Sequence, residues 1–222
     1  MPLKAADPYA DRQFHPPGGE SVNVCESFGR LPESSEATKM SDDKLKYPIG
    51  KFAFPSLEIA AQPAQRDLWI SEIAETPAKL RAAAAGLSKA QLDTPYRPGG
   101  WTARQVLHHV PESHMNAYIR FKLGLTEHEP TVKPYDEAAW AKLADIDKVP
   151  VETSLDLLDS LHQRMVALFR TMDDAQFLRS FVHPELGKVR LDQNLALYAW
   201  HGKHHIAHVL LVGQPLLAAS RL

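Results

Sequence analysis

The sequence has little of several features that would define its class, and each shortage argues against a kind of protein. A single cysteine, Cys25, rules out an internal disulfide framework and fits a reducing cytoplasm. No apolar run approaches the roughly 18 residues of a membrane span, and the opening residues lack the apolar core of a signal peptide. A net charge of −2 gives no basic field for nucleic acid or an anionic membrane. We therefore expect a cytoplasmic protein with neither of these partners.

Length and composition predict one compact domain preceded by an extension. The chain has 222 residues, 44% of them hydrophobic, which suffices for a single core. Residues 1–46 are rich in turn-forming and charged residues without a helical or strand period, so we expect them to be disordered. The compact domain is predicted to span residues 47–222. Met40 would be a natural alternative start, so we treat synthesis of the first 39 residues as a hypothesis.

Apolar residues at spacings of three and four predict four long helices. The first covers residues 64–85, with Pro77 expected to kink or divide it. The second runs from an N-cap at Thr102, with Gln105 completing a capping box, to about residue 125. The third is predicted to be capped by Ser154. The fourth is predicted to be capped by Asp192 and to end at residue 213.

The remaining signals complete the fold class. Residues 126–150 form a long connection between the second and third helices, with one short helix expected near residues 137–143. A connection of this length is often functional, for instance as a lid. Residues 181–191 predict a small hairpin that turns at residues 184–187. The sequence thus predicts an all-α protein, a four-helix bundle with a small β-hairpin and a long helix 2–3 connection.

Histidine is the abundant residue, and it is clustered. Of eleven histidines, four lie on the fourth predicted helix: His201, His204, His205 and His208. His201 and His205 are one helical turn apart on a partly apolar face, where two buried imidazoles need partners. A divalent metal is such a partner, whereas hydrogen bonds to nearby carbonyls or carboxylates are the structural alternative. His204 lies about 60° away from this face.

A second group of histidines lies on the second predicted helix, where Pro111 is expected to bend the helix right beside His109. His109 shares a face with Val106 and Val110, so we expect its ring to point inward, and His108 points about a quarter-turn away. His114 is expected to face solvent or the following loop. His183 is expected to be a turn residue in the hairpin. Three further histidines are left unassigned, namely His15, His128 and His162.

Several motifs together resemble one family. Residues 100–110, Gly-Trp-Thr-Ala-Arg-Gln-Val-Leu-His-His-Val, and residues 201–205, His-Gly-Lys-His-His, are similar to the DinB/YfiT-like superfamily of metal-binding four-helix bundles. Six shorter segments resemble its YfiT group: residues 47–52, 113–116, 120–123, 133–137, 183–185 and 198–205. The resemblance covers residue 47 to the C-terminus and does not reach the first 40 residues.

The resemblance implies one divalent ion held by His109, His201 and His205, in agreement with the facing argument. We expect zinc, with nickel, iron and manganese as the other metals that imidazole ligands suit. Members of the family are described as candidate metal-dependent hydrolases. Relatives in the superfamily resemble thiol-dependent transferases and isomerases, and the resemblance implies bacillithiol as the thiol cofactor in the YfiT-like branch. The resemblance also suggests a homodimer.

The sequence leaves the reaction open. Three imidazoles leave open positions on the metal, where bound water ionises near pH 7 and a bound thiol is deprotonated. The alternatives are a hydrolase acting on a small molecule, a transferase with a low-molecular-weight thiol as co-substrate, and a non-catalytic metal-stabilised interaction module. No residue is assigned as catalytic. Candidates for a base are Glu112, Asp136, Glu137 and His204, and Arg120 and Lys133 are candidates for an anion site, although solvated surface positions are the stronger expectation for each.

Overall fold

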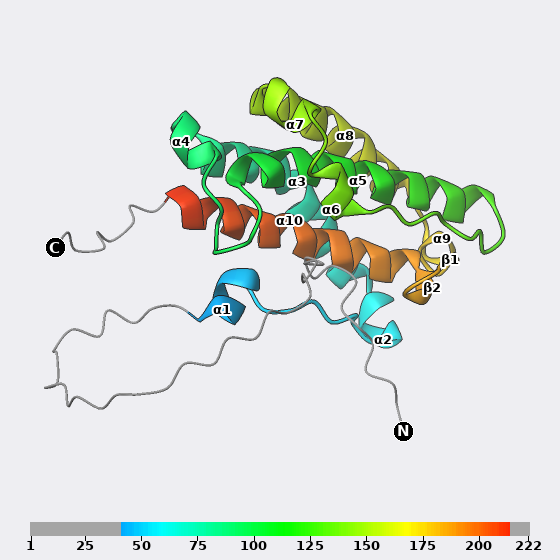
Figure 1. Ribbon diagram of the computed structural model, residues 1–222. Coiled ribbons are helices and arrows are strands. Elements are labelled where there is room, and N and C mark those ends of the chain that lie inside the picture. Colours follow the sequence, from blue (N-terminus) through cyan, green and yellow to red (C-terminus); the bar gives the residue numbers. More distant parts are fainter. Residues whose placement is uncertain (1–40, 214–222) are drawn as a thin grey trace, which may run out of the picture.

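A computed structural model describes residues 41–213, and four long helices dominate it (Figure 1). They are α3 (Pro63–Ala84), α5 (Ala103–Thr126), α8 (Val151–Thr171) and α10 (Leu191–Gly213). All four helices predicted from the sequence are present, with boundaries displaced by a few residues. The prediction of an all-α four-helix bundle is confirmed.

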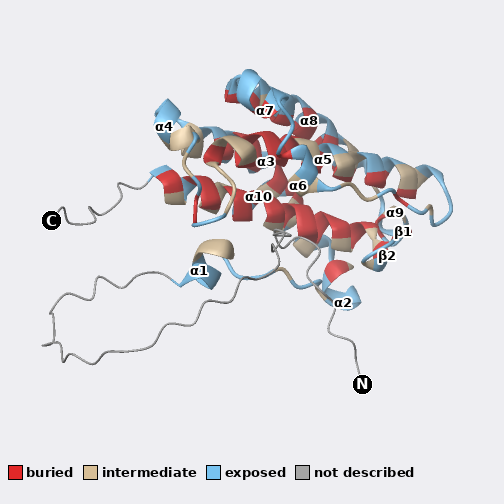
Figure 2. Cartoon of the chain, in the orientation of Figure 1, coloured by how far each residue is buried: buried red, intermediate tan, exposed pale blue. Residues whose placement is uncertain are grey.

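The helices pack in a ring whose order differs from their order in the chain. α10 packs against α3 and α5, and α8 packs against the same two helices. The chain therefore crosses the bundle between α3 and α5 and crosses it again between α8 and α10. Buried faces of these helices line the space between them (Figure 2). This order places α5 beside α10, the two helices that carry the histidine clusters.

The start of α5 is fixed by the predicted capping box. The Gln105 amide donates to Thr102 Oγ1 at 3.1 Å, and the Thr102 amide donates to Gln105 Oε1 at 2.9 Å. These bonds satisfy amide groups that the first turn of a helix leaves without a helical partner. The N-terminal turn that leads to His109 is therefore well determined by local sequence.

The two other predicted caps were wrong. α8 begins at Val151 with Pro150 as its N-cap, because the φ of proline suits a helix start. Ser154 lies inside the helix, and its hydroxyl contacts His108 Nδ1 at 2.7 Å. Asp192 lies in the first turn of α10, where its buried carboxylate accepts from the Gln193 amide and pairs with Arg190.

The two prolines do not divide their helices. α3 continues through Pro77 and α5 continues through Pro111. A proline lacks the N–H that would bond to the carbonyl four residues earlier. For Pro77 that carbonyl belongs to Ile73, and it is contacted instead by His162 Nδ1 at 2.7 Å. A side chain from α8 thus replaces the helical hydrogen bond that Pro77 removes.

Short elements close one end and one side of the bundle. The helices are α1 (Asp42–Lys46), α2 (Leu57–Ala60), α4 (Lys89–Leu92), α6 (Glu137–Trp140), α7 (Asp145–Lys148) and α9 (Asp174–Phe177), and the strands are β1 (Ser180–His183) and β2 (Gly187–Arg190). β1 and β2 pair antiparallel, with Phe181 opposite Val189, as the predicted hairpin requires. Gly187 has a φ of 73°, a conformation that favours glycine in this turn.

The long connection between α5 and α8 is held to the hairpin. The Val132 amide donates to the Val182 carbonyl at 2.9 Å, and the Val182 amide donates to the Pro130 carbonyl at 2.9 Å. The short helix α6 follows, close to where the sequence predicted one. These bonds fix the start of the connection where the sequence suggested a lid.

The segment before α3 runs beside α10 (Figure 1). α1 falls inside the segment that was expected to lack regular structure, and the Lys46 carbonyl is 3.1 Å from His208 Nε2. Residues 1–40, which carry most of the predicted extension, lie outside the described residues. Within residues 41–213, none of the helices is long and apolar enough to cross a membrane.

The bundle core consists of two apolar clusters with a layer of histidines between them. One cluster is centred on Phe121, Phe169 and Leu195, and the other on Leu107, Leu158 and Val209. Along α10, the buried histidines 201–208 separate residues of the first cluster from residues of the second. The candidate site is thus built into the core and not onto a surface loop.

Candidate metal centre

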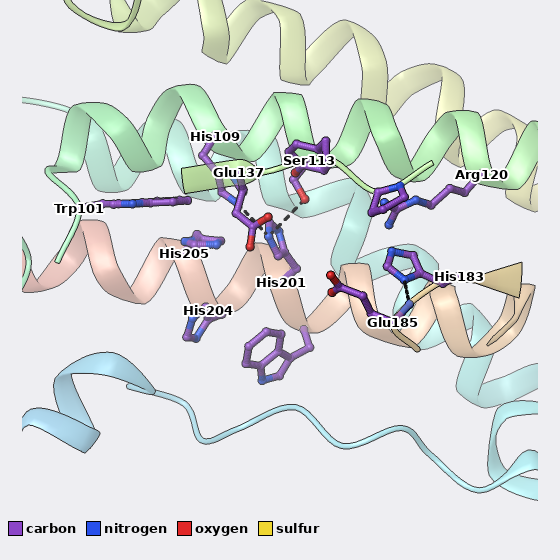
Figure 3. A pocket seen from close by; sticks show the side chains of 13 residues that line it. Trp101, His109, Ser113, Arg120, Glu137, His183, Glu185, His201, His204 and His205 are labelled. Carbon is purple, nitrogen blue, oxygen red and sulfur yellow. Dashed lines mark hydrogen bonds between the residues drawn. The ribbon is translucent and has the colours of Figure 1, made fainter. Parts of the chain in front are cut away.

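Three histidines from two helices converge, and they are the three that the sequence singled out. His109 of α5 and His201 and His205 of α10 each offer a ring nitrogen, and these atoms all lie within 4.8 Å of one another. The three residues are 5%, 2% and 8% exposed, respectively. Figure 3 shows them grouped beside Trp101, whose ring lies edge-on to His109 with centroids 4.7 Å apart. The three histidines that the sequence named therefore lie together in the fold.

The distance between two of the three rings matches that of two nitrogens on one metal ion. His109 Nε2 and His201 Nε2 are 3.3 Å apart. Two nitrogens bound to one tetrahedral zinc at 2.0–2.1 Å would be about 3.3–3.4 Å apart. Three converging imidazoles, with no carboxylate in the group, are also a donor set that zinc, nickel and other transition metals accept. The residues present fit a divalent ion.

The electrostatics favour the neutral rings that metals bind. Burial lowers the pKa of His201 and of His205 well below the usual value, and the neighbouring imidazoles lower it further. Burial also lowers the pKa of His204 to about 3. Because a metal binds the unprotonated nitrogen of a neutral imidazole, these groups are ready for binding at neutral pH.

His114 and His162 lie where the sequence did not place them. His114 was expected to face solvent or a loop, but it is fully buried. Its Nε2 is 3.1 Å from His201 Nδ1, and its Nδ1 is 2.9 Å from His162 Nε2. The prediction failed because the faces of α5 and α8 that meet here are polar, and periodicity of apolar residues gives no signal for such a contact.

His204 and His208 also take part in the buried layer. His208 stacks on Tyr96 with centroids 3.9 Å apart, and its Nδ1 is 3.4 Å from His205 Nδ1. His204 stacks on Trp200 with centroids 4.3 Å apart. Neither ring belongs to the converging group of three.

A pocket opens beside the three histidines (Figure 3). Its volume of about 50 Å³ is enough for an ion with a few water molecules or for one functional group of a substrate. The lining includes side chains of α5, α6, α10, the long connection and the end of the hairpin. Its residues are Trp101, His109, Ser113, Arg120, Pro134, Tyr135, Glu137, His183, Glu185, Trp200, His201, His204 and His205.

Some of the polar residues whose role the sequence did not decide line the pocket, and others do not. The Glu137 side chain points into the pocket toward the histidines (Figure 3). Arg120 was expected to be surface charge but is 5% exposed and lines the pocket. His183, expected to be a turn residue, ends β1 and lines it as well. The other candidates, Glu112, Asp136 and Lys133, are not among its lining residues.

The pocket is also lined by residues that the sequence analysis named only within segments resembling the YfiT group, and not as candidate site residues: Ser113, Tyr135, Glu185 and Trp200. Ser113 lies one turn beyond His109 on α5, and its hydroxyl is 3.4 Å from His201 Nε2. That spacing of four residues was available in the sequence. Tyr135 and Glu185 come from irregular segments, whose placement depends on the tertiary fold.

Comparison with known proteins identifies the family. A family model described as the DinB superfamily matches residues 72–209, which contain all three converging histidines. The chain belongs to the DinB superfamily. Within it, the Bacillus subtilis protein YfiT is 50% identical over 171 residues, which cover 77% of this chain and 94% of YfiT. A Bacillus mycoides protein is 51% identical over 168 residues, covering 74% of this chain and 93% of its own length.

The solved structure of YfiT has the same fold. It matches with a TM-score of 0.73 at 49% identity and covers 77% of this chain and 96% of its own. YfiT is described as a probable metal-dependent hydrolase with an unusual four-helix bundle topology. The Bacillus mycoides relative is likewise named as a candidate metal-dependent hydrolase. The names of these relatives thus point to metal-dependent chemistry.

Proposed function

We propose that this protein is a zinc-dependent hydrolase of small molecules, with His109, His201 and His205 as the metal ligands. The observation that carries the proposal is the convergence of these three buried rings next to a pocket that also contains a carboxylate. A bound zinc ion would supply Lewis-acid activation of a substrate oxygen and a lowered pKa for water. The names of the relatives support the same class.

The chain's own residues supply the other requirements of hydrolysis. The three histidines hold the metal and contribute no charge, so the positive charge of the metal is not cancelled by its ligands. Glu137 stands over them on α6 and takes the proton that a water molecule loses as its oxygen attacks the substrate carbonyl. Glu137 then returns this proton to the leaving group as the acyl bond breaks. Trp101 and Trp200 border the pocket and limit the entry of further water.

A second reaction is supported by Arg120. Its buried guanidinium lines the same pocket as the histidines, and arginine binds carboxylates by paired hydrogen bonds. Low-molecular-weight thiols such as glutathione and bacillithiol carry carboxylates. The alternative proposal is therefore a thiol transferase, in which Glu137 takes the thiol proton and the sulfur then displaces a leaving group from an electrophile.

One set of assays separates the two reactions. Zinc-loaded protein is tested on ester and amide substrates and on a model electrophile, each with and without bacillithiol or glutathione. Hydrolysis that proceeds without thiol, and that His201→Ala or chelation abolishes, supports the hydrolase. Turnover that occurs only with the thiol supports the thiol transferase and contradicts the hydrolase. Zinc bound at full occupancy with no turnover and no exchangeable water would favour the non-catalytic module.

A further inference from the structure

We propose that two histidine relays, each starting at a main-chain carbonyl, fix the tautomers of His201 and His205 so that both present an Nε2 lone pair to the metal. The positioning residues are His162 and His114 in one relay and His208 in the other. The inference rests on the proposed metal site and adds the residues that prepare two of its ligands. It follows from the direction that each hydrogen bond must take.

The first relay starts at the Ile73 carbonyl, which Pro77 leaves without a helical N–H donor. A carbonyl can only accept, so the contact of 2.7 Å means that His162 Nδ1 carries the proton. Burial lowers the pKa of His162 to about 4, which keeps the ring neutral at pH 7. A neutral imidazole has one N–H, so His162 Nε2 carries a lone pair.

The protonated nitrogen of His162 then determines which nitrogen of each following ring donates and which accepts. His162 Nε2 must accept from His114 Nδ1 at 2.9 Å, which leaves a lone pair on His114 Nε2. That atom accepts from His201 Nδ1 at 3.1 Å. The remaining lone pair of His201 is therefore on Nε2, the atom that faces His109 Nε2 at 3.3 Å. In this tautomer, His201 Nε2 can accept a hydrogen bond from the Ser113 hydroxyl, which is 3.4 Å away.

The second relay starts at the Lys46 carbonyl, at the end of α1, where the last carbonyls of a helix have no helical donor. His208 Nε2 donates to it at 3.1 Å, so in the neutral ring that we infer for His208 the lone pair is on Nδ1. His205 Nδ1, at 3.4 Å, must then be the protonated nitrogen of its ring. His205 also presents Nε2 as its lone pair. Each relay thus leaves the Nε2 lone pair of its final histidine free for the metal.

The arrangement explains why so many histidines are buried together. A free imidazole exchanges between two tautomers, and only one of them directs the Nε2 lone pair at the metal. Partners that hold the second ring nitrogen of a ligand are worth about 10–100-fold in metal affinity. Two main-chain carbonyls without a helical N–H donor, one opposite Pro77 in α3 and one at the end of α1, are the fixed acceptors. They set the direction of the hydrogen bonds in the two relays.

The tautomers can be observed directly in the full-length protein by long-range ¹H–¹⁵N correlation spectra of the histidine rings. The assignments come from single histidine variants, and spectra are recorded with zinc and after its removal. We expect the proton on Nδ1 in His114, His162, His201 and His205 and on Nε2 in His208, in both states. A proton on Nε2 of His201 or His205 in the zinc-free protein would overturn the proposal.

A matched pair of variants tests the energetic part by competition with a chelating dye. His114→Gln can still accept from His201 and donate to His162, whereas His114→Phe can do neither. We expect H114F to weaken zinc affinity by about 10–100-fold and H114Q to retain most of it. Equal affinities for the two variants would count against the relay. If the unaltered protein does not bind zinc, the metal site itself is wrong, while the zinc-free spectra still decide the tautomers.

Discussion

A substitution of Glu137 distinguishes a role in catalysis from a role in metal binding. Its carboxylate lines the pocket but is not part of the three-histidine group. Glu137→Gln should therefore lower kcat by about 10²–10⁴-fold, the usual contribution of a general base, and leave zinc content unchanged. Asp136→Asn is the control, because Asp136 caps α6, asparagine caps equally well, and the side chain does not line the pocket. Loss of zinc in Glu137→Gln would show that this carboxylate is a ligand and not a base.

His162 should make the stability of the zinc-free protein depend on pH. Its folded pKa of about 4 lies below the ordinary value of 6.5, so the ring takes up a proton on unfolding between these values. The contribution of the neutral His162 ring to the free energy of unfolding is complete above about pH 6.5. It is lost as the pH falls toward 4, at up to about 1.4 kcal/mol per pH unit.

Urea unfolding of the protein and of His162→Gln at pH 7 and pH 5, with chelator present, measures this effect. The difference in unfolding free energy between them should shrink as the pH falls. A difference that is the same at both pH values would contradict the assignment of His162 as a neutral buried ring.

At the residue scale, the sequence pointed to the three converging histidines but not to the buried histidines that contact them. His201 and His205 could be found because a spacing of four residues puts two rings on one helix face, and His109 because apolar neighbours mark the inward face of α5. His114 and His162 could not be found in this way, because their partners come from other helices and the contacts are polar.

At the scale of the elements, the close approach of α10 to α3 depends on Gly202. A Cβ added there would lie 2.7 Å from Thr76 Oγ1 and 2.8 Å from Thr76 Cγ2. The β-branched Thr76 side chain has little freedom to move, and its hydroxyl donates to the Glu72 carbonyl at 2.9 Å. The glycine thus allows the two helices to pack closely beside the turn that carries His201 and His205.

Gly202→Ala should lower the free energy of unfolding by about 1–3 kcal/mol, because overpacking outweighs the gain in helix propensity. Gly213→Ala is the matched control on the same helix, since its Cβ would meet Leu87 at an ordinary 3.5 Å. Thermal and urea unfolding of both variants check the prediction. Equal stabilities for the two variants would mean that α3 and α10 adjust without cost.

The elements also show where local sequence rules hold and where they give way. The capping box of α5 was predictable because it involves residues three apart. The caps of α8 and α10 were not, since Pro150 starts α8 earlier and Ser154 contacts His108 instead. Pro77 is compatible with a continuous α3 because His162, from a helix far along the chain, satisfies the freed carbonyl.

At the scale of the whole molecule, the metal would join α5 to α10 between the two apolar clusters. The fold class followed from helix periodicity, but the diagonal crossings did not, because periodicity does not specify which helices are neighbours. With the proposed site formed only in the folded chain, zinc at 100 times its Kd should add about 2.7 kcal/mol of stability. Thermal unfolding at increasing zinc concentration measures this gain, and His128→Ala, which changes an exposed histidine, should retain it.

The metal content of the purified protein tests the central claim most directly. Full-length protein is loaded with zinc, dialysed and measured by elemental analysis beside single His→Ala variants of His109, His201, His205 and His128. The account predicts one zinc per chain in the unaltered protein and in His128→Ala, and little or none in the other three variants. Zinc retained in full by those three, or absent from the unaltered protein, would contradict it.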